Sequence, residues 1–438
     1  MSDSGSVFQL KAFTQSYDWG KLGTTSKVAQ YAKMADPNFH LDEAKPYAEL
    51  WMGTHPNAPS RTLEGRPLPQ VLTENSGLLG SKRRKDLPFL FKVLAIRKAL
   101  SIQSHPDKKL AERLHKEQPN VYKDGNHKPE MAIAITPFTA LCGFQPPDNI
   151  VENLQTVPEL AALIPQALVQ EFISAKEDAA TSNDESTKAA LRSSLRKVFE
   201  ALMTAPPKTV SLQVSALLAR LSSTEATPIT SLVQTLYQQF SSDIGIFCVY
   251  VLNLLTLQPG EAIFLGAGEP HAYISGECVE VMATSDNVLR AGLTPKPRDV
   301  NNLVGSLTYS MTSGEKHLVR PTPWGGGGDG EDGGARYGGI DDGDGGRVGK
   351  TKLYDPPVEE FSVLHVSLRQ DETEHHRAID GPSIVIATSG KGEMVGAGDG
   401  VGSFNLEEGT VLFIGAGEEV VWKARSHDGL EIYRAFCE

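Results

Sequence analysis

The spacing of hydrophobic residues divides the chain into strand-like and helix-like parts. Before about residue 150, short apolar stretches such as 131–135 lie between turn residues, which predicts mostly β-structure with a helix at 108–115. Between about 151 and 243 the apolar residues recur every three or four positions, which predicts three amphipathic helices. The apolar positions of these helices are Leu191, Leu195, Val198 and Leu202; Val214, Leu217, Leu218 and Leu221; and Val233, Leu236, Tyr237 and Phe240. Short strands return after Val251, so the predicted fold class is mainly β with an α insertion.

One pattern of apolar and turn residues occurs twice. Residues 257–269 (LQPGEAIFLGAGE) align without gaps with residues 406–418 (LEEGTVLFIGAGE), and both copies predict a strand, a tight turn and a second strand. The PGE turn between apolar strands is typical of cupin jelly rolls, so we predict two cupin-type jelly-roll β-barrels plus a helical domain. In this register His271 of the first copy corresponds to Val420 of the second. A metal site that used His271 would therefore be absent from the second barrel.

These patterns predict a division of the chain into domains. Residues 1–150 form the first part of a catalytic cupin barrel, 151–243 an inserted helical domain, 244–310 the remainder of that barrel, and 311–438 a second, metal-free cupin barrel. The segment 325–349 holds 13 glycines and six acidic residues among its 25 residues, which predicts a disordered surface insertion. We expect the helical domain to border the functional site.

Charge and composition exclude several classes of protein. The 438 residues carry a net charge of −12 and no long basic run, so general nucleic-acid binding is not expected, although a local cationic pocket is compatible with this charge. The most apolar run, 244–257, is broken by polar residues and is too short to span a membrane, and the N-terminus lacks the pattern of a signal peptide. The four cysteines lie far apart without a CxxC pair, which fits a reducing compartment. We therefore predict a cytoplasmic protein with neither a nucleic-acid nor a membrane partner.

A few uncommon polar residues indicate a metal site. Gln103 and His105 are two positions apart, so on a strand their side chains share one face. Together with His271 and a carboxylate, they form a mixed nitrogen and oxygen donor set that suits Zn²⁺ and also Fe²⁺ or Mn²⁺. The absence of thiolates favours a catalytic site with an open position. From the residues alone, His127 competes with Glu130 as the third ligand, Glu130 could simply pair with a neighbouring lysine, and a QxH strand could be ordinary core polarity.

Several segments resemble a known family. Residues 122–130 (YKDGNHKPE) and 271–296 (HAYISGECVEVMATSDNVLRAGLTPK) resemble the two signature segments of type I mannose-6-phosphate isomerases, and 100–108 and 47–60 resemble other blocks of that family. The resemblance is weaker over the C-terminal barrel. It implies a zinc enzyme, with one Zn²⁺ per chain, that interconverts mannose 6-phosphate and fructose 6-phosphate. The ligands that it implies are Gln103, His105, Glu130 and His271; the implied catalytic arginine is Arg290; and the implied pocket residues are Lys128, Glu280, Asp286 and Lys296.

The chemistry of an aldose–ketose isomerisation needs residues of these types. A proton moves between C1 and C2 through a cis-enediolate, whose negative charge a divalent metal can stabilise. We choose Glu280 as the proton-transfer base, with metal-bound water as the competing choice. Arg290 could stabilise the enediolate or bind the phosphate, or it could be a surface salt-bridge partner.

Substrate binding needs a cationic pocket in this acidic chain. Lys296 and Lys128, with the Ser101 hydroxyl, are the candidates for the phosphate, since the chain has no P-loop glycine pattern. Asp286 is either a sugar contact or a turn residue. Trp19 and Trp51 are expected to be core anchors of the barrel and to lie outside the catalytic set.

Two other classes of function compete with the isomerase. An Fe²⁺ cupin dioxygenase would use two histidines and one carboxylate, but the cationic pair Arg290 and Lys296 counts against it. A non-catalytic sugar-binding bicupin would retain a metal for structure, but the loss of the histidine in the second copy argues that the fold does not need one. We therefore predict a monomeric isomerase that acts on a small phosphosugar and supplies mannose 6-phosphate for GDP-mannose synthesis and glycosylation.

Overall fold

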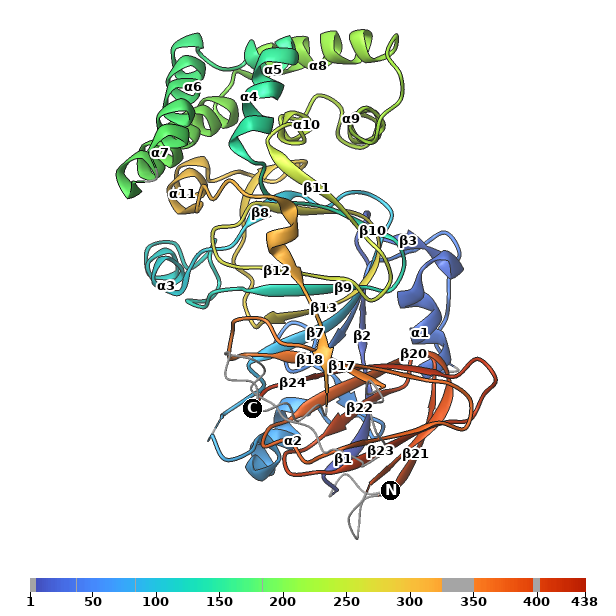
Figure 1. Ribbon diagram of the computed structural model, residues 1–438. Helices are drawn as coiled ribbons and strands as arrows, with labels where there is room; N and C mark the ends of the chain where they lie inside the picture. The colour runs from blue at the N-terminus through green and yellow to red at the C-terminus, as the bar shows by residue number, and fades with distance from the viewer. Residues whose placement is uncertain (1–4, 37, 83, 183, 325–349, 397–401) are drawn as a thin grey trace.

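The chain folds into three layers, with a helical layer, a central β unit and a C-terminal β unit following one another from top to bottom in Figure 1. The computed structural model describes residues 5–36, 38–82, 84–182, 184–324, 350–396 and 402–438. The predicted insertion at 325–349 lies outside these residues. The predicted fold class, mainly β with an α insertion, is confirmed.

The central β unit is built on a sheet whose strands do not follow their order in the sequence. Its main path runs β15-β12-β9-β13-β7-β5-β2, and four further strands pair outside this path. Among the described residues its eleven strands are β2 (Phe13–Gln15), β5 (Glu49–Met52), β7 (Phe89–Ile96), β8 (Ile102–Ser104), β9 (Glu130–Ala134), β10 (Phe138–Phe144), β11 (Leu252–Leu257), β12 (Ala262–Leu265), β13 (His271–Ala283), β14 (Leu289–Gly292) and β15 (Leu318–Val319). The strand expected around 131–135 is thus β9.

The C-terminal β unit repeats this plan with the main path β16-β17-β18-β24-β20-β22-β1-β6. Its eleven strands in the described ranges are β1 (Val7–Lys11), β6 (Arg61–Thr62), β16 (Thr322–Pro323), β17 (Thr351–Tyr354), β18 (Ser362–Leu368), β19 (Thr373–His376), β20 (Ser383–Gly396), β21 (Ser403–Glu407), β22 (Val411–Ile414), β23 (Val420–Ala424) and β24 (Leu430–Phe436). Strand β1 pairs with β22, so the start of the chain joins the sheet of this unit. The predicted division instead assigns all of residues 1–150 to the catalytic barrel. The domain boundaries themselves stay predictions.

The repeated segment forms the same strand–turn–strand in both units. It gives β11 and β12 in the central unit and β21 and β22 in the C-terminal unit. The turn glycines Gly260 and Gly409 have φ of 84° and 85°, in the left-handed region that a residue with a Cβ rarely adopts. His271 begins β13 and Val420 begins β23, so the register predicted from the repeat holds at the residue that differs between the copies.

The alternation of side chains in β7 determines what lies inside the central unit. Every residue of this strand is buried. Phe89, Phe91, Val93 and Ala95 pack into a hydrophobic cluster that the two β units share. The residues between them face the interior of the central unit, because successive side chains of a strand point to opposite faces. Lys92 is one of these interior residues.

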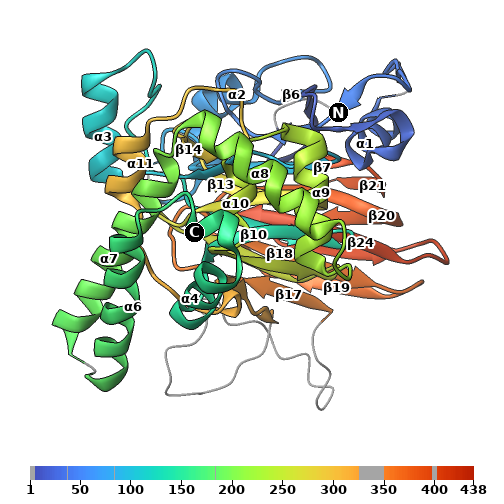
Figure 2. The same cartoon turned by 90° about the horizontal axis from the view of Figure 1, so that it is seen from above.

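The helical layer covers one end of the central unit, and seen from above its helices lie over the strands (Figure 2). The helical layer consists of α4 (Pro147–Thr156), α5 (Pro158–Ala161), α6 (Gln166–Thr181), α7 (Glu185–Met203), α8 (Pro207–Leu221), α9 (Pro228–Phe240) and α10 (Gly245–Cys248). The other described α-helices, α1 (Lys27–Ala35), α2 (Leu68–Glu74), α3 (Lys108–Glu117) and α11 (Val300–Ser306), lie outside this layer. The three helices predicted from spacing are α7, α8 and α9, and the helix expected at 108–115 is α3.

One hydrophobic cluster joins the helical layer to the central unit. It includes Leu195 and Val214 from the helices and Phe144 and Leu289 from the strands, all fully or almost fully buried. At the start of α9, Pro228 occupies the first turn, and Thr227 and Thr230 form a capping box. None of the helices that the structure describes combines the length and the apolar character that a bilayer crossing requires.

Candidate functional site

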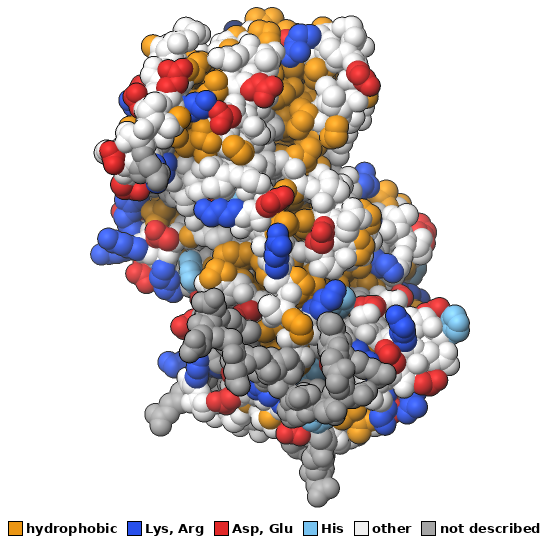
Figure 3. Space-filling model, viewed as in Figure 1, with side chains coloured by type: hydrophobic (Ala, Val, Ile, Leu, Met, Phe, Trp, Pro, Cys, Tyr) orange, Lys and Arg blue, Asp and Glu red, His pale blue; other side chains and the backbone are white. Residues whose placement is uncertain are grey.

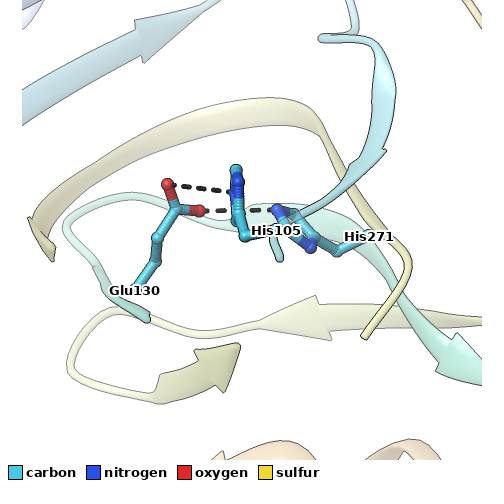
Figure 4. A group of neighbouring side chains, drawn as sticks. All are labelled: His105, Glu130 and His271. Atoms are coloured by element: carbon cyan, nitrogen blue, oxygen red, sulfur yellow. Dashed lines mark ion pairs between the residues drawn. The ribbon is translucent and has the colours of Figure 1, made fainter. Parts of the chain in front are cut away.

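Three buried side chains converge inside the central β unit. His105 follows β8, Glu130 begins β9 and His271 begins β13, and their ligating atoms all lie within 4.8 Å of one another (Figure 4). Each Nε2 atom of the two imidazoles lies 3.4 Å from a carboxylate oxygen of Glu130. Strand pairing brings them together, because β13 pairs with both β8 and β9.

Backbone carbonyls orient both imidazoles. His105 Nδ1 lies 2.7 Å from the carbonyl oxygen of Asn287, and His271 Nδ1 lies 2.9 Å from that of Glu269. Since a carbonyl only accepts, each Nδ1 carries a proton, and Nε2 is the ring nitrogen that faces the cluster. Burial also lowers the pKa of His105 to about 4, which keeps its ring neutral at pH 7.

The atoms that face one another have no hydrogen-bond partner among the described residues. They are Nε2 of His105, Nε2 of His271 and Oε2 of Glu130, all of them buried. Burial alone would raise the pKa of Glu130, but the Lys128 ammonium at 3.2 Å and the two imidazoles hold it well below its ordinary value. Two imidazoles and one ionised carboxylate with unsatisfied buried atoms are a donor set that fits a divalent metal ion.

The structure places the other two candidate ligands differently. Gln103 pairs directly opposite His271 and borders the cavity described below, so the oxygen of its amide can serve as a fourth donor. Its role stays a prediction. His127 points away from the cluster, and its Nε2 pairs with Glu360 near the C-terminal unit. Of His127 and Glu130, the two candidates for the third ligand, Glu130 therefore lies with His105 and His271.

A cavity of about 660 Å³ opens beside the cluster. The predicted site residues that line it are Ser101, Gln103, Lys128, Glu130, Glu280, Asp286, Arg290 and Lys296. From the helical layer, Phe240 of α9 also lines it, so the expectation that this layer borders the site is confirmed. Trp19 and Trp51 pack in hydrophobic clusters as expected, and both also line the cavity, while their exclusion from the catalytic set stays a prediction.

Two cations on the cavity wall lack an acidic partner. Arg290 is half-buried on β14, and Lys296 is exposed in the loop that follows. Neither forms an ion pair with any carboxylate in the described part of the chain, which is unlike an ordinary surface salt bridge. Burial lowers the pKa of Arg290 from its ordinary value, but an arginine remains protonated at pH 7. Both are free to bind an anion.

Asp286 lies in the loop between β13 and β14, beside the cavity. Its carboxylate lies 3.3 Å from His55 Nε2 and accepts from Asn57 Nδ2 at 3.4 Å. Its backbone N–H donates to Asp124 at 2.9 Å. The hydrogen bond from His55 holds the pKa of Asp286 below its ordinary value, so the residue presents an ionised acceptor. The structure places Asp286 at the cavity, and its role as a sugar contact stays a prediction.

Glu280 belongs to a buried ion-pair network that was not predicted from the sequence. Lys92 Nζ lies 3.0 Å from Glu280 and 3.8 Å from Glu49, and Trp51 donates its indole N–H to Glu49. The ammonium also lies 5.4 Å from the centre of the Trp51 ring. The sequence contains an indication of this network, because Lys92 is the one charged residue in the apolar stretch FLFKVLAI. A lysine is almost never fully buried without a partner.

This network sets the charge of the two central groups. Burial raises the pKa of Glu280 above its ordinary value, while the Lys92 ammonium opposes that rise. For Lys92, burial would lower the pKa, but the carboxylates of Glu280, Glu49 and Glu130 together raise it. A carboxylate whose pKa is moved toward neutrality, beside a fixed cation, is suited to accept and return a proton.

Models of known families match three parts of the chain. They describe the catalytic domain (residues 7–147), the helical insertion domain (163–252) and the C-terminal part (352–397) of type I phosphomannose isomerase. The resemblance read from the sequence is thereby confirmed.

Similar proteins extend the match to the whole chain. The mannose-6-phosphate isomerase of Cryptococcus neoformans is 44% identical over 99% of this chain and 100% of its own length. That of Homo sapiens is 41% identical over 98% of each chain. A crystal structure of a mannose 6-phosphate isomerase bound with zinc and yttrium has a TM-score of 0.77 at 28% identity, covering 99% of this chain and 100% of that one. The apo form from Salmonella typhimurium also has a TM-score of 0.77, at 27% identity. The chain belongs to the type I phosphomannose isomerase family.

Proposed function

We propose that this chain interconverts D-mannose 6-phosphate and D-fructose 6-phosphate in the cavity beside His105, Glu130 and His271. The observation that carries the proposal is the combination of a metal-binding donor set with the unpaired cations Arg290 and Lys296 around one cavity. Such a site can bind a sugar phosphate and stabilise negative charge near its carbon chain. The full-length similarity to mannose-6-phosphate isomerases supports this enzyme class.

We propose one Zn²⁺ as the resident metal, held by His105, Glu130 and His271 with Gln103 as the fourth ligand. The two imidazoles and the ionised carboxylate, with no thiolate in the group, support an ion that accepts nitrogen and oxygen donors. When bound, Zn²⁺ supplies a Lewis acid that stabilises negative charge on substrate oxygens. The zinc-bound structure of a similar isomerase supports the same choice.

Glu280 is the proposed proton-transfer base. Its carboxylate takes the proton from C2 of the aldose and returns it to C1, while the hydroxyl proton moves from O2 to O1, so that the aldose and ketose have the same composition. Burial makes the carboxylate a stronger base than an exposed glutamate. Lys92, at 3.0 Å, holds it in position and keeps it ionised between turnovers.

The remaining candidates bind and orient the substrate. Lys296 at the cavity rim, with the Ser101 hydroxyl, is proposed to hold the phosphate, and Arg290 to stabilise the enediolate. Lys128 keeps Glu130 ionised from 3.2 Å and adds positive charge to the same wall. Asp286 accepts a hydrogen bond from a sugar hydroxyl.

The cellular setting stays a proposal. We propose a cytoplasmic monomer that supplies mannose 6-phosphate for GDP-mannose synthesis and glycosylation. None of the four cysteines forms a disulfide in the described residues, and all four are buried. On the face shown in Figure 3, lysines and arginines are interspersed with acidic residues and do not gather in one basic patch, which fits a small-molecule substrate better than a nucleic acid.

The decisive experiment follows the conversion of mannose 6-phosphate to fructose 6-phosphate by one preparation as purified, after chelation, and after addition of Zn²⁺. We expect activity to disappear with the chelator and to return with zinc in proportion to the bound metal. Addition of Fe²⁺ under air, with oxygen consumption followed in parallel, tests the dioxygenase alternative.

The equivalent positions of the two β units offer a matched pair of variants. His271→Ala should abolish metal binding and turnover, whereas Val420→Ala at the corresponding position of the C-terminal unit should keep both. A folded, zinc-loaded chain without isomerase activity would contradict the proposed reaction. Activity that persists in His271→Ala would contradict the proposed ligand set.

A further inference from the structure

The C-terminal β unit has a counterpart of the catalytic site, in which one acidic position carries a positive charge instead. In the central unit, Glu280 of β13 pairs across the sheet with Lys92 of β7 and Ala132 of β9. In the C-terminal unit, Arg434 of β24 pairs in the same way with Leu364 of β18 and Val385 of β20. Arg434 therefore occupies the position of Glu280.

The ligand positions correspond as well. Glu130 lies opposite Leu265 of β12, and Ser383 lies opposite Ile414 of β22, which is the residue that the repeat aligns with Leu265. Gln103 lies opposite His271, and His376 lies opposite Val420. Two carboxylates of the catalytic site are thus replaced by a hydroxyl and a guanidinium.

Arg434 is fully buried and only partly satisfied. Its side chain has an exposed fraction of 0%, as do Ser383 and His376. Nε donates to Ser383 Oγ at 3.0 Å, and Nη1 donates to His376 Nδ1 at 3.4 Å. Nη2 is buried without a hydrogen-bond partner among the described residues.

The imidazole of His376, which contacts Arg434, carries no negative charge that could balance the guanidinium. Since a guanidinium has no acceptor, His376 Nδ1 must accept, and its Nε2–H then donates to Thr351 Oγ1 at 3.0 Å. The Thr351 hydroxyl in turn donates to Glu374 at 2.9 Å. His376 is therefore neutral, and burial together with Arg434 lowers its pKa well below the ordinary value.

No carboxylate within the described ranges forms an ion pair with Arg434. Glu438 acts on it only at longer range and is itself paired with Arg377 at 3.5 Å. Burial and Arg377 lower the pKa of Arg434 to about 9, so the group is still charged at pH 7. A buried charge without a counter-ion is strongly unfavourable, and a free N–H on that same charge is a binding position for an anion.

We propose that Nη2 of Arg434 binds a small inorganic anion, chloride under ordinary salt conditions, inside the C-terminal β unit. Arg434 and the two polar side chains that contact it, His376 and Ser383, are all fully buried, and so enclosed a position favours a monatomic anion over a phosphate or a carboxylate. Arg434 reverses the charge of Glu280 at the corresponding position, and the proposed anion site does not depend on the proposed isomerase activity. Its effect is on the stability of this unit, and turnover is not expected to need it.

The test uses the full-length, zinc-loaded protein. Thermal unfolding is measured while chloride or bromide replaces gluconate at constant ionic strength. We expect the unfolding temperature to rise and then saturate with either halide, because binding to the native state alone stabilises it according to the free anion concentration. In crystals grown with bromide, an anomalous peak is expected within hydrogen-bond distance of Arg434 Nη2.

Two variants separate this site from a general salt effect. Arg434→Met should lose the saturable response, whereas Arg425→Met, which removes an exposed arginine of the same unit, should retain it. If Arg434→Met does not fold, the halide titration of the wild-type protein and the bromide crystals still test whether the anion binds at Arg434. A linear or absent halide response, a water molecule at Nη2 in bromide crystals, or a response that survives in Arg434→Met would each overturn the proposal.

Discussion

The two β units share a backbone plan and differ in what they bury. Each has a long strand whose interior face carries an ionisable residue, Glu280 in one unit and Arg434 in the other. The central unit surrounds this position with Lys92 and a cluster of ligands, and it opens to a cavity. The C-terminal unit surrounds it with apolar side chains, the Ser383 hydroxyl and one neutral imidazole.

The comparison teaches that the fold and the chemistry are set by different residues. Turn glycines and alternating apolar positions are common to both copies and are enough to form the sheets. The chemistry depends on a few interior positions, since His271 is replaced by Val420 without loss of the strand that follows it. A core can therefore lose a metal site when its apolar packing compensates.

The largest expected effect is the loss of the ligand carboxylate. Glu130→Gln keeps the size of the side chain but removes its charge, so the donor set becomes neutral and metal binding weakens. We expect kcat/KM to fall roughly 10³-fold, because the metal contributes several kcal/mol to the stabilisation of charge. Zinc content, measured together with activity, should fall in parallel.

The matching position in the C-terminal unit sharpens this result. Ser383→Ala removes a hydroxyl at the position that corresponds to Glu130 and should leave both zinc content and kcat/KM unchanged. Full zinc occupancy in Glu130→Gln would show that the carboxylate is not needed to hold the metal.

The second prediction concerns Lys92, whose position in the C-terminal unit is occupied by Leu364. Lys92→Met removes the ammonium that opposes the raised pKa of Glu280, so this pKa should rise further. The base is then protonated over a wider range, and the acidic limb of the pH profile of kcat should move to higher pH. We expect roughly a 10²-fold lower kcat at pH 7, with partial recovery at higher pH.

Its control is Lys197→Met, which removes an exposed ammonium paired with Glu171 on the helical layer. This variant should keep the pH profile of the parent protein. An unshifted acidic limb in Lys92→Met would mean that Glu280 is not the group whose titration limits turnover. Breaking a buried ion pair also costs about 3–5 kcal/mol of stability, so the folded fraction must be measured first.

Much of this comparison could be predicted from the sequence. The repeat placed His271 and Val420 at corresponding positions, and regular apolar spacing placed α7, α8 and α9. The ligand residues lie on conspicuous polar segments between apolar strands. These features are local, and the periodicity of a helix or strand preserves them in the sequence.

The parts that could not be predicted depend on contacts between distant segments. The pairing of β1 with β22 joins residues about 400 positions apart, as the bounds Val7–Lys11 and Val411–Ile414 show. Helix α6 buries only Val169 and Phe172 fully, so its apolar pattern is too weak to stand out. The orientation of His127 toward Glu360 also arises from packing between the units, which no spacing within one segment records.

The third prediction compares the two turn glycines of the repeat. Gly260→Ala meets no atom closer than 3.9 Å, so its cost is the positive φ alone, about 1 kcal/mol. Gly409→Ala has the same φ, but its Cβ would lie 2.2 Å from the carbonyl oxygen of Tyr31 in α1. Overpacking adds to the strain, and we expect about 3 kcal/mol in total. Urea unfolding of both variants measures the difference, and equal losses would contradict a close contact between α1 and the second turn.

The smallest effect is the pH dependence contributed by the buried imidazole of the C-terminal unit. His376 has a folded-state pKa well below its unfolded value of about 6.5, so the unfolded chain binds a proton that the native state does not. The stability that depends on the neutral ring is therefore present above that pH and is lost as the pH falls. Between pH 6.5 and 5 the loss is about 2 kcal/mol from this group.

His376→Gln removes the titrating group while keeping an amide that can hydrogen-bond in its place. The unfolding free energy of this variant should fall less steeply between pH 6.5 and 5 than that of the parent, by about 2 kcal/mol over the interval. His427→Gln, at an exposed histidine of the same unit, should keep the parent slope. If His376→Gln also keeps that slope, the imidazole is protonated in the native state. The positive charge at the centre of the C-terminal unit would then be larger than that of Arg434 alone, and its contrast with the carboxylate-rich catalytic site would be greater still.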